Sequence, residues 1–488
     1  MLALRGPLRF LVSSILVALV YLVDPFYIVS GSSRVSEEIV QRVLSFFYRN
    51  DAQSKVALVL VDDKDAEDVN GPAGWPLPLD MQGDILRGLL CANPAGVFVD
   101  VNFRAERKPG EAALLADALR FRRGPEGCAQ IADGAALAQA APVLLAHVPS
   151  RSSACQPLAT TGDACALRDA FSSVRASAIP VAMPGTSDFS RYVLVGPESS
   201  NDIPGSSSPA LELYLRICAA RPDFAPGCRD REQLARLKDP DGNTSARIAT
   251  VRWGFFVSEP PGLETKNALI GACPEAQHAG TNTLRALLDQ FVADLAPRAV
   301  DVFGSGVRLG KSGWCPYHLT FTRETAFSGN AAKLLEDRVV VYGAATTAGN
   351  DIAYSPVLGV LPAAHVHAMM LDNLLQNGAD YWRDPPTLLH EGVEVFVAIV
   401  IIAFGVWRSP RILSSQNPAM RSCLFYAGSI AFVFLVAAFL MCVFKWSPIN
   451  WTGLLAIAFI EGPGLFRDPT KCVDGVASGT RKTESHSL

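Results

Sequence analysis

The run of residues from Cys423 to Phe444 carries no charged side chain, and it limits the possible folds of this chain more than any other segment. A helix needs about 20 apolar residues to cross the hydrocarbon core of a bilayer. Three other segments share this apolar character, although Glu461 and Pro463 interrupt the last one; they are Leu8–Ile28, Leu388–Trp407 and Ile449–Phe466. We therefore expect four transmembrane helices, one N-terminal and three C-terminal.

The first apolar segment has two interpretations, a retained anchor and a cleaved signal peptide. Its apolar run is long for a signal peptide, and Ser30–Ser33 offers only a weak cleavage site. The anchor over residues 1–30 is the favoured prediction, and the cleaved signal stays open. Glu394 and Glu461 fall near the ends of apolar segments, where a charged side chain can reach the membrane interface.

Positive charges predict the orientation of the four helices, because Lys and Arg accumulate in short cytoplasmic segments. They precede the first helix, separate the second from the third, and follow the fourth; they are Arg5, Arg9, Arg408, Arg411, Arg421, Arg467, Lys471, Arg481 and Lys482. Four helices place all of these charges on the cytoplasmic side. The predicted organisation is an anchor (1–30), an extracytoplasmic domain (31–388) with a long insertion at about 149–315, three transmembrane helices (389–466) and a disordered cytoplasmic tail (467–488).

Cysteine usage agrees with an extracytoplasmic position for the middle of the chain. The chain has 11 cysteines, and most of them fall between the first and second apolar segments. Their number suits disulfide bonding in an oxidising compartment. Short spacing suggests Cys155 with Cys165 and Cys218 with Cys228 as candidate disulfides, and the alternative is that several cysteines are buried thiols.

The middle of the chain alternates strand and helix patterns. Apolar and β-branched runs predict buried strands at Lys55–Asp63, Gly96–Phe103, Pro142–Val148 and Arg338–Tyr342. Apolar residues at helical spacing predict helices at about 80–91, 110–121 and 363–376. This alternation predicts an α/β domain with a mainly parallel sheet and right-handed crossovers.

Polar residues gather where the predicted strands end, and parallel sheets bind ligands beyond the carboxyl ends of their strands. The candidate ligand-binding residues are Asp62, Asp63, Trp75, Asp100, Asn350, Asp351 and His367. The carboxylates suit a divalent cation or a polar ligand, but Asp also caps helices, and Trp75 can simply fill the edge of the sheet. We assign no catalytic residue and expect no organic cofactor, because no nucleophile elbow, phosphate-binding loop or helical zinc pair is present.

Three blocks of this sequence resemble the CHASE2 domain, an extracytoplasmic sensor module of bacterial signalling proteins. They are VALVLVDDKD followed by GWPLP, GVFVDVNFRAE followed by ALLADALRF, and VVVYGAATTAGNDIAYSPVLGVLPAAHVHAMMLDNLL. An anchor, a sensor and three closely spaced helices also resemble the architecture of that family. Leu77 and Leu79 stand near positions where the family often has an aromatic and a basic residue, so the ligand of this chain can differ.

The resemblance implies a multi-pass receptor in a bacterial inner membrane, with its large domain on the periplasmic side. We expect this receptor to detect an unknown extracytoplasmic ligand and to have no enzymatic activity of its own. Because only residues 467–488 follow the last helix, it would act as a homodimer or through a separate effector. Two alternatives stay open: a metal-assisted hydrolase using Asp62, Asp63, Asp100 and Asp351, and a scaffold subunit of a membrane complex. The net charge of −4 argues against nucleic-acid binding.

Overall fold

The computed structural model divides the chain into two compact units. We call them the helical unit (Met1–Gln41 with Trp382–Leu488) and the α/β unit (Arg42–Tyr381). The structure describes residues 2–24, 28–45, 47–101, 103, 108–124, 127–131, 140–147, 178–182, 191–195, 207–230, 247–254, 317–327, 331–347, 352–383, 387–404 and 418–461.

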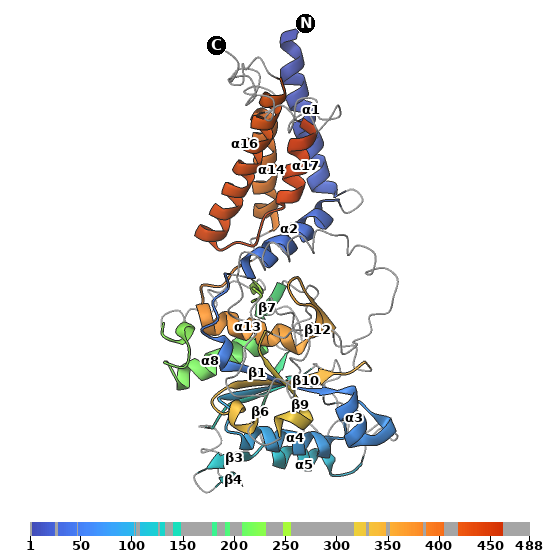
Figure 1. Cartoon of the computed structure of the whole chain (residues 1–488), viewed down its shortest axis with the longest axis vertical. Helices are drawn as coiled ribbons and strands as arrows, with labels where there is room; N and C mark the ends of the chain where they lie inside the picture. The colour runs from blue at the N-terminus through green and yellow to red at the C-terminus, as the bar shows by residue number, and fades with distance from the viewer. Residues whose placement is uncertain are drawn as a thin grey trace, which may run out of the picture. The chain divides into compact units, whose positions relative to one another are not determined.

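A six-stranded parallel sheet forms the centre of the α/β unit (Figure 1). The strand order is β6-β5-β2-β10-β1-β9, and each neighbouring pair is parallel. The strands are β1 (Val56–Asp62), β2 (Gly96–Asp100), β5 (Val143–His147), β6 (Ala178–Ala182), β9 (Leu319–Thr322) and β10 (Val339–Ala345). The predicted α/β fold with a mainly parallel sheet is therefore confirmed.

Both faces of the sheet are buried along β1, β2 and β10, which explains why these strands are apolar along nearly their whole length. Side chains alternate between the two faces of a strand. In β1, Leu58 and Leu60 join one hydrophobic cluster, whereas Val59 and Val61 join another. Helices α8 (Pro209–Ala220) and α13 (Ala364–Asn377) cover the first face, here called the α13 face. Helices α4 (Leu79–Cys91) and α5 (Glu111–Ala118) cover the second, here called the α4 face (Figure 1).

Shorter elements surround the sheet. Three antiparallel pairs are formed by β3 (Phe121–Gly124) with β4 (Gly127–Gln130), β7 (Arg191–Val195) with β8 (Arg247–Thr250), and β11 (Ile352–Ser355) with β12 (Gly359–Pro362). The short helices are α3 (Asp63–Asn70), α11 (Arg323–Ala326) and α12 (Ala331–Leu335), and single 3-10 turns cover Gln53–Lys55, Gly71–Ala73 and Pro226–Cys228.

Two disulfides join described cysteines of the α/β unit. Cys218 is bonded to Cys228, the pair suggested by spacing, and Cys91 is bonded to Cys128, which spacing did not suggest. Cys155 and Cys165 lie outside the described residues. The disulfides fit a domain that folds in an oxidising compartment.

The helical unit contains α1 (Leu2–Val23), α14 (Thr387–Ala403), α16 (Pro418–Phe439) and α17 (Trp451–Glu461). A π-helical turn, Leu440–Phe444, continues α16. Ala398, Val433 and Leu454 form part of a buried cluster between α14, α16 and α17. Helix α2 (Ile28–Ser45) begins in this unit, and the boundary between the two units falls within it, after Gln41.

One helix among the described residues, Phe425–Phe444, is long and apolar enough to cross a membrane, with a mean hydropathy of 2.6. Only 22% of its apolar window is buried inside the protein, unlike a core helix of a soluble domain. A shorter apolar segment, Phe10–Tyr21, lies within α1. The described residues thus contain one of the four expected spans, and the other three stay predictions.

Replacing Gly227 with Ala should destabilise the α/β unit. A Cβ there would overlap the carbonyl oxygen of Leu374 and lie 2.6 Å from the nitrogen of Gly378, and these backbone atoms at the end of α13 cannot rotate away. Overpacking of this kind costs about 1–3 kcal/mol, so the thermal midpoint of the full chain should fall. Gly124→Ala is the control, because its Cβ meets only an ordinary contact at 3.8 Å; an equal midpoint for both variants would contradict this packing.

Candidate functional site

The acidic residues that follow β1 bind backbone amides. Asp62 caps α3 by accepting from the Asp65 nitrogen at 2.7 Å. Asp63 accepts from the Thr347 nitrogen at 3.0 Å and so holds the residues that follow β10. Asp65, which the sequence analysis did not select, is buried and accepts from the nitrogens of Arg323 and Glu324 at the start of α11. Burial and the charge of Asp62 raise the pKa of Asp65. These contacts are those of helix caps and loop anchors.

A second group of polar side chains lies on the α13 face at the end of β2. Asp100 is only 9% exposed, and its Oδ2 lies 3.9 Å from Nε2 of His367, on α13. On the other side of the imidazole, Nδ1 is hydrogen-bonded to the Tyr192 hydroxyl of β7 at 2.7 Å. The Phe98 ring meets the imidazole edge to face, with centroids 5.2 Å apart. Two candidate residues, Asp100 and His367, are therefore brought together, and Tyr192 joins them.

The position of Gly343 in β10 explains how α13 comes so close to the sheet here. A Cβ at Gly343 would lie 3.0 Å from the Cβ of Ala364, the first residue of α13, and 3.7 Å from the Cβ of Asp100. The missing side chain thus makes room for the start of the helix beside the carboxyl group. A glycine in a strand interior often marks such a close approach.

Burial controls the charge of Asp100. Its Oδ2 has no hydrogen-bond partner among the described residues, and removal from water raises the pKa of this carboxyl to about 7. Desolvation disfavours the charged form of an acid. Asp100 therefore changes its protonation state near neutral pH, with the His367 imidazole beside it.

The remaining candidate residues do not join this group. Trp75 is partly buried and packs against the hydrophobic cluster of the opposite, α4 face. Asn350 and Asp351 lie outside the described residues. Within the described ranges, no group of three or more His, Cys, Asp or Glu side chains is placed to hold a metal ion.

A third polar cluster, centred on Asp372 of α13, fastens the segment after α2 to the α/β unit. The Tyr48 hydroxyl donates to Asp372 Oδ1 at 2.5 Å, and His318 Nε2 lies 3.2 Å from Asp372 Oδ2. The Asn373 amide donates to the Tyr48 hydroxyl at 3.1 Å. Asp372 is fully buried, and both of its oxygens have partners, as a buried carboxylate requires.

The same helix makes two further polar contacts around this cluster. Gln376 accepts from the Ala52 nitrogen at 3.1 Å and donates to Asp51 at 3.1 Å. Burial, together with the charge of His318, lowers the pKa of His365 to about 3, so its imidazole is neutral at physiological pH. One face of α13 thus binds the chain from Tyr48 to Ala52 through several hydrogen bonds.

The first half of α2 is bound by polar groups of the helical unit. Asn450 donates from its amide to the Ser32 hydroxyl at 2.7 Å, and Thr452 donates from its backbone nitrogen to the Ser36 hydroxyl at 3.0 Å. Glu394 of α14 is buried and accepts from the Asn450 nitrogen at 2.6 Å. Glu394 thus supports the start of α17, a role that its position in the sequence did not reveal.

Hydrophobic pattern alone does not predict the two clusters around α2, although the sequence carries one signal. Asp372, Asn373 and Gln376 interrupt an otherwise apolar helix in the block LDNLLQN. Polar residues at buried helical positions need partners. The sequence could therefore have marked these residues as contact points, but their partners Tyr48, Asp51 and Ala52 lie 324 or 325 residues away in the chain.

A parallel sheet covered by helices on both faces defines an α/β protein, and its described residues include one helix long and apolar enough to cross a membrane. The family model of the CHASE2 domain matches residues 16–407, which is most of the chain. The chain therefore belongs to the CHASE2 family, whose domain is an extracytoplasmic sensory domain, and the predicted resemblance is confirmed. No curated protein and no solved structure matches the chain.

Replacing Asp100 with Asn should remove a pH dependence of stability. Between about pH 4 and pH 7 the folded carboxyl keeps a proton that the unfolded chain releases, so stability of the natural protein falls as the pH rises through this window. The difference in unfolding free energy between protein and variant should change by on the order of 1.4 kcal/mol per pH unit there, and level off above it. Denaturant titrations of both full chains across the window measure this, and a constant difference would contradict it.

Proposed function

We propose that this protein is a membrane receptor that detects an extracytoplasmic signal with its CHASE2 domain and transmits it along α2 to its transmembrane helices. The observation that carries the proposal is that α2 is fastened at both ends. Ser32 and Ser36 are bound by the start of α17, and the chain just after α2 is bound through Tyr48 to Asp372. A helix held in this way moves when either attachment is rearranged.

The input to this helix would come through α13. The same helix carries Asp372, which holds Tyr48, and His367, which lies beside Asp100 at the end of β2. A ligand can shift a receptor only if it binds two arrangements unequally. A small displacement of α13 would alter the hydrogen bonds to Tyr48, so α13 is the element that would join a sensory event to α2.

A multi-pass arrangement in a bacterial inner membrane is part of this proposal. Large apolar side chains of α1 and α16 are exposed in the helical unit; they include Leu8, Leu11, Ile15, Leu16, Leu19, Phe434, Leu435 and Phe439. Apolar surface of this extent is typical of contact with lipid or another protein. We assign α1, α14, α16 and α17 to the membrane, and the α/β unit to the periplasmic side.

The partner and ligand are also proposals. We propose that the receptor acts as a homodimer or through a separate effector; a symmetric dimer is the commonest form of homo-oligomer. The hydrolase and the metal site are less well supported, since Asp62 and Asp63 are used to bind backbone amides. A divalent cation is not required by any contact described above.

The transmitting role of α2 predicts different effects of two matched Tyr→Phe changes. Tyr48 and Tyr342 are both buried, and each donates at 2.5 Å to a side-chain oxygen, of Asp372 and Gln82 respectively. Tyr48→Phe should speed amide hydrogen exchange in α2 and the first turn of α17 by roughly 10- to 100-fold, since a bond to a charged acceptor contributes about 1.5–3 kcal/mol.

Tyr342→Phe is the control, because its hydrogen bond lies on the α4 face and does not touch α2. It should leave exchange in α2 unchanged. Exchange measured by mass spectrometry on both full chains in lipid nanodiscs compares the two changes. Equal exchange in α2 for both variants would rule out the proposed route through Tyr48.

The proposed orientation predicts the activity of reporter fusions. Alkaline phosphatase, which folds only outside the cytoplasm, should be active when fused after Asn377 and inactive when fused after Arg411. Green fluorescent protein at the same two positions should give the reverse pattern. Active phosphatase at both positions would contradict the assignment of α14 to the membrane.

A further inference from the structure

A pocket of about 520 Å³ lies on the α4 face, away from the polar clusters around Asp100 and Asp372. Its lining comes from α3, α4, the β3–β4 hairpin, and α11 with the residue after it; it consists of Val69, Met81, Asp84, Ile85, Arg87, Gly88, Cys91, Phe121, Cys128, Arg323 and Phe327. Pockets of about 300–1,000 Å³ are the size that holds small-molecule ligands. None of these residues was among the candidate ligand-binding residues of the sequence.

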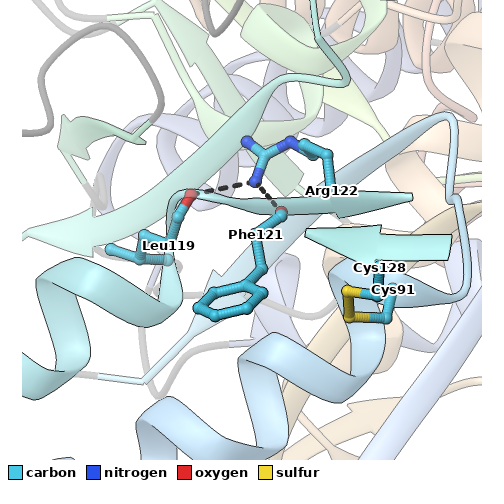
Figure 2. Close-up of a disulfide and its surroundings, with 5 residues drawn as sticks. All are labelled: Cys91, Leu119, Phe121, Arg122 and Cys128. Atoms are coloured by element: carbon cyan, nitrogen blue, oxygen red, sulfur yellow. Dashed lines mark hydrogen bonds between the residues drawn. A yellow bond between two sulfur atoms is a disulfide. The ribbon is translucent and has the colours of Figure 1, made fainter. Parts of the chain in front are cut away.

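The hairpin wall of the pocket is held at both ends (Figure 2). The Cys91–Cys128 disulfide ties β4 to the end of α4. At the base of the hairpin, the buried Arg122 guanidinium donates to the carbonyl oxygens of Leu119 and Phe121 at 2.9 and 2.6 Å. Figure 2 shows the Phe121 ring on the opposite side of β3 from this guanidinium. The wall that carries Phe121 is therefore formed before any ligand binds, which lowers the entropic cost of binding.

A second part of the lining depends on a glycine. A Cβ at Gly88 would lie 2.5 Å from Cε1 of Phe327, so the ring rests directly on the backbone of α4. Phe327 is 39% exposed, and Met81 and Val69 extend the apolar lining beside it. Two aromatic rings and two aliphatic side chains thus offer an apolar surface to a flat ligand.

Two guanidinium groups and one carboxylate, that of Asp84, line the pocket, so its lining is positive on balance. Arg87 pairs with Asp84 at 2.9 Å and lies over the Phe121 ring. Arg323 Nε is buried and has no hydrogen-bond partner among the described residues. The Arg323 backbone nitrogen, by contrast, is bonded to Asp65, which fixes the residue at the start of α11. A buried N–H group without a partner favours an anionic acceptor, to which charge-assisted hydrogen bonds are strong.

We propose that this pocket binds a small molecule that has a flat apolar body and one carboxylate group. The body lies between Phe121 and Phe327, and the carboxylate accepts from Arg323. This inference rests on the proposed receptor function, because it names the chemical class of the extracytoplasmic ligand. Ligand binding and the transmitting role of α2 are measured in separate experiments, so either proposal can be contradicted while the other is supported.

The test uses indole-3-acetate as a probe and indole-3-acetamide as its uncharged match. Calorimetric titration of the full chain in lipid nanodiscs should give saturable binding of the acetate, about tenfold tighter than the amide. Arg323→Met should lower the affinity for indole-3-acetate by roughly the same factor and leave the affinity for indole-3-acetamide unchanged. Arg123→Met is the control, because Arg123 is exposed on the same hairpin but does not line the pocket.

A second variant tests the apolar part of the site without touching its charge. In Gly88→Ala the new Cβ displaces the Phe327 ring, and we expect the ring to move into the pocket. The affinities for both probes should then fall to a similar degree. Equal affinity for acetate and amide, an equal effect of Arg323→Met and Arg123→Met, or no saturable binding above that of empty nanodiscs would each overturn the proposal. None of these results would alter the expected hydrogen-exchange difference between Tyr48→Phe and Tyr342→Phe.

Discussion

The burial of both faces of one parallel sheet determines how the rest of the α/β unit is arranged. All of β10 is buried, and neighbouring strands satisfy its backbone, so the apolar side chains above and below have to be covered by helices. Helix α13 covers one face and α4 the other. Each covering helix then presents a different chemistry: α13 contributes buried polar groups, and α4 contributes one wall of an open apolar pocket.

The buried carboxyl groups on the α13 face differ in their partners, and this difference separates their roles. Asp372 has a partner at each oxygen, so the joint between α13 and Tyr48 is held in one geometry. Asp100 has one oxygen without a partner among the described residues, and burial raises its pKa to about 7. The fully paired Asp372 suits a mechanical attachment. Asp100, by contrast, has a charge that depends on pH close to neutrality, and His367 lies beside it.

Much of the fold was predictable, because a parallel strand buried on both faces typically forms a near-continuous apolar run. The strands at 56–62, 96–100, 143–147 and 339–345 were expected for this reason, and α13 begins one residue after its predicted start. β9, with two threonines among its four residues, lacks such a run and was missed. The candidate site was less predictable. Asp100 and His367 do lie close together, as the sequence suggested. Asp62 and Asp63 lie at the same edge of the sheet, but they bind backbone amides there.

The sequence by itself determined the α/β order, the uncharged helix near the C-terminus and membership of the CHASE2 family, because hydrophobic pattern is a property of each segment taken alone. The tertiary structure decided which distant residues meet. Tyr48 reaches Asp372 and Cys91 reaches Cys128 only because the crossovers place their elements side by side. Such pairings depend on the order of strands in the sheet, which inserts β10 between β1 and β2, and no local run of residues encodes that order.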